Sequence, residues 1–253
     1  MGTVLIYLIH FQGDHVDFSA KILYGSDMPR GARLLVPSGI YHVLCRGNNR
    51  QDIFKDDADR RKFLSLLLRY KNRYHIEIFH YCLMCNHVHI IVRAEREVAL
   101  SRAMHGLDLT YAQHFRRRYG GIGHFWQDRF KSFLIEKERY LLECGRYVEL
   151  NSTRARIYEN PKQDLWNSYQ HYAFGKSDRV LDEHPIFGEM GSTARERRES
   201  YRDFVHQGLK DRRGLQRYFR QKVCGSPLYA KTILETLGLK PTHFRVGRPS
   251  KIL

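Results

Sequence analysis

Two histidines separated by one residue occur in the segment Asn86-His87-Val88-His89-Ile90. This segment favours a β-strand, in which side chains two positions apart point to the same face. The Cα atoms of the two histidines would lie about 6.6–7 Å apart, because a strand rises roughly 3.3 Å per residue. Imidazole is the commonest neutral metal ligand, so both rings could bind one cation and leave positions open for a phosphate. The spacing also fits two half-exposed polar side chains on an amphipathic strand.

Two cysteines upstream allow a different metal site. Cys82 and Cys85 precede the histidines in the pattern C-x-x-C-x-H-x-H, which could hold a structural zinc ion. On an extended backbone Cys85 shares a face with His87 and His89, whereas Cys82 faces the other way. Only a tight turn between the cysteines would bring all four side chains together.

Tyr111 is a candidate nucleophile. It lies in a predicted helix over residues 98–119, whose apolar stripe runs directly into Arg116-Arg117-Arg118. A tyrosine in such a stripe is ordinarily a core residue. Beside a metal ion and arginines, however, a tyrosine could attack a phosphodiester and form a covalent intermediate. The divalent ion would then act as the Lewis acid.

Alternating and helical hydrophobic patterns predict the elements that must position these residues. The predicted strands cover residues 40–46, 75–83, 87–93 and 129–136. The predicted helices cover residues 56–74, 98–119 and 140–157. This order predicts an α+β fold with an antiparallel central sheet, in which the second and third strands form a hairpin.

Composition predicts a polyanionic partner. The 253 residues include 43 Lys and Arg against 27 Asp and Glu, which gives a net charge of +16. Such a charge favours nucleic acid, because Lys and Arg neutralise phosphates, although plain surface solvation would also account for it. Abundant apolar and aromatic residues exclude a disordered chain. No apolar run is long enough to span a bilayer, so we expect no membrane partner. Five scattered cysteines favour a reducing cytoplasm over a disulfide framework.

The chain divides into three predicted parts. Residues 1–27 form an N-terminal extension whose pattern connects poorly to the strands and helices after it, so Met28 is expected to be the natural start. An ordinary extra strand is the alternative for this stretch. Residues 28–175 form the catalytic domain, and residues 176–253 form a basic helical C-terminal extension with a tail.

Several sequence blocks, in order along the chain, carry a family resemblance. They are Pro37-Ser38-Gly39-Ile40-Tyr41-His42-Val43, Arg46-Gly47-Asn48-Asn49-Arg50, Tyr81-Cys82-Leu83-Met84, Asn86-His87-Val88-His89, Tyr111 with Phe115, Gly123-His124-Phe125-Trp126-Gln127-Asp128-Arg129-Phe130-Lys131, Arg146-Tyr147-Val148 with Leu150-Asn151, Trp166-Asn167-Ser168-Tyr169 and Gly247-Arg248-Pro249. Together they resemble the single-tyrosine HUH transposases, in the IS200-like branch that includes the REP-associated tyrosine transposases.

The resemblance implies a fold and a reaction. The fold would be the HUH-nuclease palm, a central antiparallel sheet of ferredoxin-like or RRM-like type flanked by helices. His87 and His89 would bind Mg²⁺ or Mn²⁺, and Tyr111 would attack single-stranded DNA beside a hairpin. The products would be a 5′-phosphotyrosine and a free 3′-OH that can rejoin strands without ATP.

One departure from the family concerns the third metal ligand. Relatives carry asparagine five residues after the tyrosine, where this chain has Arg116, which cannot bind a cation. We therefore expect Gln113, or alternatively His114, to complete the metal site. The departure also keeps open a second function, a domesticated hairpin-binding protein with little or no cleavage activity.

Basic side chains are expected to line a DNA groove, although each one alone fits a solvated charge. The predicted contacts are Arg46, Arg50, Arg116, Arg117, Arg129 and Lys131. Gly247-Arg248-Pro249 resembles a minor-groove hook, with a plain tail as the alternative. We expect a monomer or homodimer in the cytoplasm, associated with the nucleoid.

Overall fold

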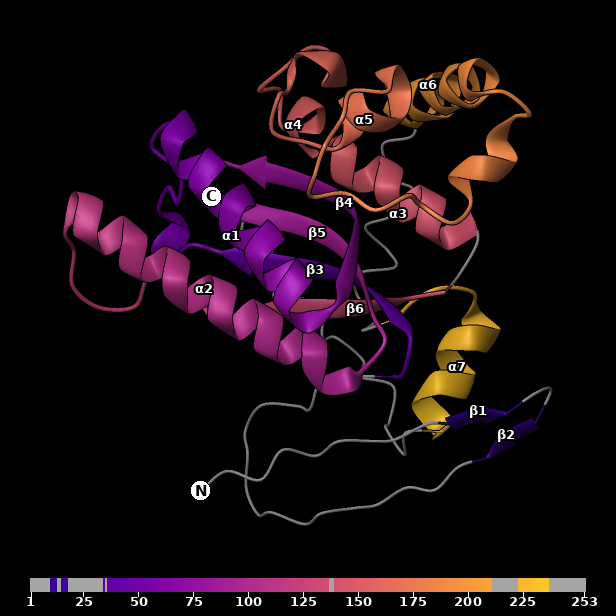
Figure 1. Cartoon of the computed structure of the whole chain (residues 1–253), viewed down its shortest axis with the longest axis horizontal. Helices are drawn as coiled ribbons and strands as arrows, with labels where there is room; N and C mark the ends of the chain where they lie inside the picture. Colours follow the sequence, from indigo (N-terminus) through magenta and orange to yellow (C-terminus); the bar gives the residue numbers. More distant parts are fainter. Residues whose placement is uncertain are drawn as a thin grey trace, which may run out of the picture.

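The computed structural model describes residues 10–12, 15–17, 34, 36–136, 139–210 and 223–236 (Figure 1). Its larger sheet contains β3 (Gly39–Arg46), β4 (Ile76–Met84), β5 (His87–Ala94), β6 (Lys131–Ile135) and β7 (Val223–Cys224). The longer helices are α1 (Asp57–Tyr74), α2 (Glu97–Tyr119), α3 (Arg139–Glu149), α6 (Ala194–Lys210) and α7 (Pro227–Thr236). Shorter elements are η1 (Asn48–Arg50), α4 (Asn151–Arg154), η2 (Pro161–Gln163), α5 (Tyr169–Phe174) and η3 (Phe187–Met190).

The large sheet has the strand order β4-β5-β3-β6-β7. The strands from β4 to β6 pair antiparallel, as predicted, and β4 and β5 form the predicted hairpin. The structure adds an edge strand that was not predicted, β7, which pairs parallel with β6. The edge strand β7 lies in the predicted C-terminal extension, residues 176–253. This extension therefore adds a strand to the sheet that residues 39–135 form.

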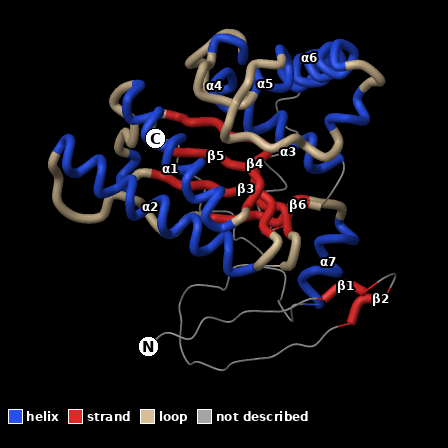
Figure 2. The backbone as a smooth tube through the Cα atoms, viewed as in Figure 1, coloured by secondary structure: helices blue, strands red, loops and turns tan. Residues whose placement is uncertain are grey.

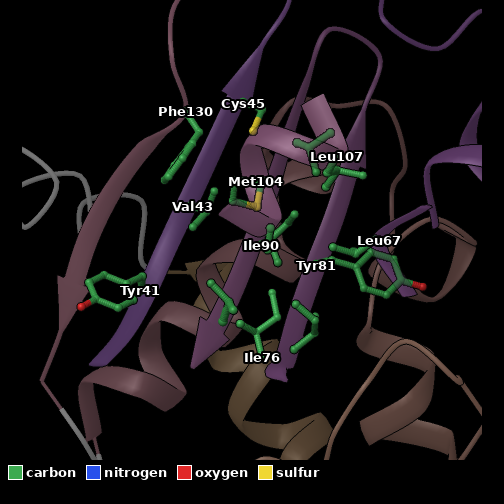
Figure 3. Close-up of a cluster of buried hydrophobic side chains, with 14 of the residues drawn as sticks. Tyr41, Val43, Cys45, Leu67, Ile76, Tyr81, Ile90, Met104, Leu107 and Phe130 are labelled. Atoms are coloured by element: carbon green, nitrogen blue, oxygen red, sulfur yellow. The ribbon is translucent and has the colours of Figure 1, made fainter. Parts of the chain in front are cut away.

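Alternation along the strands divides the core into two layers. Tyr41, Val43 and Cys45 of β3 point to the face that α1 and α2 cover, where they join the larger hydrophobic cluster (Figure 3). Ile40 of β3 and Ile91 of β5 point to the opposite face and pack with Leu141 and Cys144 of α3. Figures 1 and 2 show the helices on the two sides of the sheet. The buried side chains of β3 and β5 therefore pack against either α1 and α2 or α3.

The predicted helices are confirmed within a few residues, with one break. The helix predicted over 140–157 ends at Glu149, and Asn151–Arg154 form the separate helix α4. In the N-terminal part, β1 (His10–Gln12) pairs antiparallel with β2 (His15–Asp17). Most of residues 1–27 and the Gly247-Arg248-Pro249 segment lie outside the described residues. Among the helices that the structure describes, none combines the length and the apolar composition of a membrane span.

The first turn of α1 is joined to the last turn of α2 by an ion-pair network. Asp56 is the N-cap residue of α1, and its side chain accepts a hydrogen bond from the Asp59 backbone N–H at 2.9 Å. Arg118 donates to Asp56 at 2.6 Å and to the buried Asp59 at 2.7 Å. Tyr119 donates its hydroxyl to Asp59 at 2.9 Å.

These contacts lower the pKa of both carboxyl groups. The Arg118 guanidinium, followed by the Asp59 backbone N–H, holds the pKa of Asp56 far below its ordinary value of 3.8. Burial raises the pKa of Asp59, but hydrogen bonds from the Lys55 backbone, Arg118 and Tyr119 outweigh it and lower that pKa. A carboxyl whose pKa is lower in the folded state stabilises the fold above its unfolded pKa. That stabilisation is lost as the pH falls.

We predict that Arg118→Ala lowers the melting temperature at pH 7, and that the difference from wild type shrinks as the pH falls below about 4. The reason is that both carboxylates become protonated and no longer attract the guanidinium. Thermal unfolding followed by circular dichroism across pH checks this. Arg117→Ala is the matched control, since Arg117 is exposed on the same helix turn. A difference that stays constant at all pH values would contradict the prediction.

Candidate active site

The predicted histidine pair lies on one face of β5, as the alternation requires. The ring centroids of His87 and His89 are 4.9 Å apart, with the rings nearly perpendicular. His89 is buried and His87 is half-buried. Both side chains point to the face that α3 covers, because they share the alternation of Ile91.

Hydrogen bonds at the Nδ1 atoms leave the Nε2 atoms of both rings available. Nδ1 of His87 donates to Oδ1 of Asn86 at 2.6 Å, which in the neutral ring leaves the lone pair on Nε2. Nδ1 of His89 lies 2.8 Å from Nε2 of His42 on β3, and these two rings stack with centroids 5.0 Å apart. In the described part of the chain neither Nε2 atom has a hydrogen-bond partner. Such an arrangement fits metal ligation.

Burial keeps these histidines neutral. It lowers the pKa of His87 to about 4, with a further contribution from the Arg46 guanidinium. It also lowers the pKa of His42 to about 3 and holds the pKa of His89 well below its ordinary value. Neutral imidazole is the form that binds metal ions.

The tyrosine that the fold brings to the histidines is Tyr147 of α3. Its ring centroid lies 6.0 Å from that of His89 and 6.1 Å from that of His42. Burial raises the pKa of the Tyr147 hydroxyl, and the Arg154 guanidinium opposes this effect. The guanidinium carbon of Arg154 lies 5.4 Å from the centre of the Tyr147 ring.

The structure does not bring Tyr111 to the histidines, and this prediction is corrected. Tyr111 lies on α2, which covers the opposite face of the sheet, and its side chain is fully buried. Its hydroxyl donates to the backbone carbonyl of Ile53 at 2.6 Å. Phe54 and Phe63 pack against its ring at centroid distances of 5.6 and 5.2 Å. Tyr111 is therefore a satisfied core residue.

The other predicted residues of α2 are corrected for the same reason. Gln113 is exposed on that helix, and Nε2 of His114 lies 3.6 Å from Asp59. Neither can complete a site on the α3 face. Arg116 donates to the carbonyl of Gly123 at the end of α2, and Arg117 is exposed beside it. Arg116 stands where relatives carry asparagine, but it lies on the opposite side of the sheet from the histidines. Its presence therefore gives no reason to expect a damaged metal site.

Two of the predicted DNA contacts share the face of the histidines. Arg46 is the direct partner of His87 in the β3–β5 ladder, and its side chain is exposed. Lys131 pairs with Leu44, which in turn pairs with His89. Arg50 lies in η1, where its carbonyl accepts a hydrogen bond from Asn86 at 3.3 Å. Arg129 is exposed just before β6.

The zinc alternative is not supported. Cys82 is paired with His89 across the hairpin, so it shares that face, contrary to the expectation from an extended backbone. Its sulfur is buried 3.9 Å from Asp164, whereas Cys85 is exposed in the turn. No group of three His, Cys, Asp or Glu side chains in the described ranges is placed to hold a metal ion. A metal bound by the two histidines would need a ligand of another type.

Asn151 is the polar side chain that lies one helical turn after Tyr147. Its amide nitrogen donates to the carbonyls of Tyr147 at 2.9 Å and Val148 at 3.2 Å. The amide oxygen has no protein partner among the described residues. An amide oxygen is a ligand type that Mg²⁺ accepts. A tyrosine followed four residues later by an amide is the local signal that could have identified this helix from sequence.

A buried carboxylate holds the end of the tyrosine helix in place. Glu149 is fully buried and accepts hydrogen bonds from His80 of β4 at 3.0 Å and Ser168 at 2.7 Å. Its second oxygen accepts from the Tyr201 hydroxyl of α6 at 2.7 Å. Gly145 allows this close approach, because a Cβ there would lie 2.5 Å from Nε2 of His80. The carboxylate thus ties α3 to the sheet and to the C-terminal region.

The chain was compared with family models and solved structures, and the matching segment includes β5 and α3. The family model described as "Transposase IS200 like" matches residues 36–151. A solved structure of a REP-associated tyrosine transposase bound to a REP hairpin aligns with a TM-score of 0.49 and 16% identity, covering 62% of this chain and 93% of that one. A candidate transposase of Deinococcus radiodurans R1 aligns with a TM-score of 0.33 and 12% identity, covering 56% and 98%. No curated protein matches the sequence.

We predict that Tyr111→Phe keeps DNA cleavage and costs about 1 kcal/mol of unfolding free energy, because it removes one buried hydrogen bond. Urea unfolding and a cleavage assay with a DNA hairpin check this. Loss of cleavage in a variant that stays folded would restore Tyr111 as a candidate nucleophile.

We predict that Tyr201→Phe costs about 1–3 kcal/mol, because one oxygen of the buried Glu149 carboxylate loses its donor. Urea unfolding measures this loss. Tyr229→Phe is the control, since Tyr229 lies on α7 away from this carboxylate. If Tyr201→Phe and wild type have the same free energy of unfolding, the hydrogen bond from Tyr201 to Glu149 does not stabilise the position of α3.

Proposed function

We propose that this chain, whose residues 36–151 match the IS200-like transposase family model, nicks and rejoins single-stranded DNA with Tyr147 as the nucleophile. The observation that carries this assignment is the 6.0 Å separation of the Tyr147 and His89 rings on one face of the sheet. Tyr111, on the other face, packs against Phe54 and Phe63, and the histidine ring 5.9 Å from it, that of His114, belongs to its own helix and not to the pair on β5.

The chemistry follows from these groups. The Tyr147 oxygen attacks the phosphorus and loses its proton, the bond from phosphorus to the 3′ oxygen breaks, and the leaving 3′ oxygen takes up a proton. The products are a 5′-phosphotyrosine and a free 3′-OH, which can attack the same linkage in reverse. The Arg154 guanidinium stabilises negative charge on the tyrosine oxygen, and so opposes the effect of burial on the hydroxyl pKa.

The two histidines would hold a divalent cation. Mg²⁺ or Mn²⁺ bound through the Nε2 atoms of His87 and His89, with the Asn151 oxygen as third ligand, would act as a Lewis acid on the scissile phosphate. His42 supports this role through its contact with His89, which orients that ring. Two neutral nitrogen ligands and one oxygen ligand suit Mn²⁺ at least as well as Mg²⁺.

The DNA substrate is inferred from the charge and the family. Arg46 and Lys131 share the sheet face of the histidines, where they can neutralise phosphates on either side of the scissile bond. The hairpin preference is proposed from the family membership. A hairpin in the DNA would fix which single-stranded phosphate reaches Tyr147.

We predict that the wild-type chain with Mn²⁺ forms a covalent adduct with a labelled single-stranded hairpin from the DNA beside its gene. The adduct should survive a denaturing gel and disappear with Tyr147→Phe or with EDTA. His87→Ala should reduce adduct formation at least about 100-fold, because the cation loses a ligand.

Tyr140→Phe is the matched control, since Tyr140 lies on the same helix two turns away. It should leave the adduct unchanged. Tight binding of the hairpin on a native gel without any adduct would contradict the proposal and favour the hairpin-binding protein that does not cleave.

A further inference from the structure

A second basic site lies far from Tyr147. A cleft of about 500 Å³ is lined by Arg73, Tyr74 and His75 at the end of α1, and by Glu95, Arg96 and Arg102 at the start of α2. It adjoins the end of β5 at Ala94, whereas the histidine pair begins at His87 on the other end. Seven residue steps at roughly 3.3 Å separate these ends by about 23 Å.

The three arginines of this cleft lack acidic partners. Within the described ranges no Asp or Glu forms an ion pair with Arg73, Arg96 or Arg102. Glu95, the one carboxylate of the lining, accepts a hydrogen bond from Ser38 at 2.6 Å and lies 3.7 Å from Arg93. Its charge is therefore partly neutralised by groups outside the cleft.

The ends of two helices meet at this cleft. Arg96 is the N-cap residue of α2, and its side chain makes no capping hydrogen bond. The 23-residue helix thus points the positive end of its dipole at the cleft, whereas α1, which ends there at Tyr74, points the negative end of its own dipole at it, so the net positive charge comes from the arginines. Three unpaired guanidinium groups beside this end repel one another, and an anion would relieve that repulsion.

We propose that this cleft binds phosphate oxyanions, and that the DNA acted on at Tyr147 supplies them through its backbone. The source of the phosphates rests on the proposed function, whereas the cleft itself does not. Arginine suits this role, because its planar group donates two parallel hydrogen bonds to a phosphate. A strand stacked as in B-form DNA, at roughly 3.4 Å per nucleotide, would need about seven nucleotides to cover this distance from the scissile phosphate.

The test compares DNA binding by two double variants in a Tyr147→Phe background, which removes cleavage from the measurement. Arg96→Ala/Arg102→Ala removes two cleft arginines, and Arg61→Ala/Arg69→Ala removes two exposed arginines of α1 outside it. Fluorescence anisotropy gives the affinity for a hairpin with long single-stranded arms at several salt concentrations. The cleft variant should bind about tenfold more weakly or worse, and its salt slope should fall by about one for each lost contact. The control variant should bind like the parent.

A second arm uses inorganic phosphate and pyrophosphate without DNA. Both anions should raise the melting temperature of the parent and of the control, but not of the cleft variant. A response to these anions with unchanged DNA affinity would support the cleft and assign it to a free phosphate ligand. If DNA affinity and anion response are the same in all three proteins, the cleft proposal is wrong. Absence of DNA binding by the parent would count against the proposed function alone.

Discussion

The pleat of β5 decides which residues can act together. Successive side chains of this strand point to opposite faces, so His87 and His89 can meet only groups on the α3 face. That face supplies His42 from β3 and Tyr147 from α3, with ring centroids within about 6 Å of His89. The other face is filled by α1 and α2, which form the larger core (Figure 3). One strand therefore separates the face that carries the histidines and Tyr147 from the face on which Tyr111 is part of the core.

Placing a tyrosine beside the histidines requires that α3 be held firmly, and buried polar groups do this. Glu149 lies two residues after Tyr147 and bonds to β4, to Ser168 and to α6. A carboxylate buried in this way is costly unless every oxygen is satisfied, so the contact specifies one position of the helix. The region after residue 175 thus helps to hold α3 in position, because the Tyr201 hydroxyl donates a hydrogen bond to Glu149. The same region supplies β7, the parallel edge strand.

Much of the fold could be predicted from the sequence, because hydrophobic periodicity is a local property. The periodicity of Phe63, Leu66 and Leu67 predicted α1, and the alternation of β5 placed both histidines on one face. The choice between Tyr111 and Tyr147 as the proposed nucleophile could not be made in this way. Tyr111 and Tyr147 both lie in amphipathic helices, and periodicity does not tell which face of a sheet a helix covers. The break at Leu150 was missed because Asn151–Arg154 are helical again directly after it, so that the two helices are separated by a single residue. The parallel pairing of β7 depends on contacts between distant segments, which no local pattern records.

The central claim is that Tyr147, and not Tyr111, becomes bonded to DNA. Peptide mapping of the covalent adduct by mass spectrometry after trypsin and nuclease digestion tests it directly. Cleavage after Arg146 and Arg154 releases a peptide in which Tyr147 is the sole tyrosine, whereas Tyr111 falls in the peptide between Arg102 and Arg116. We predict that the nucleotide mass is found on the peptide from Tyr147 to Arg154. A nucleotide mass on the Tyr111 peptide would contradict the account, because it would require the two faces of the sheet to exchange roles.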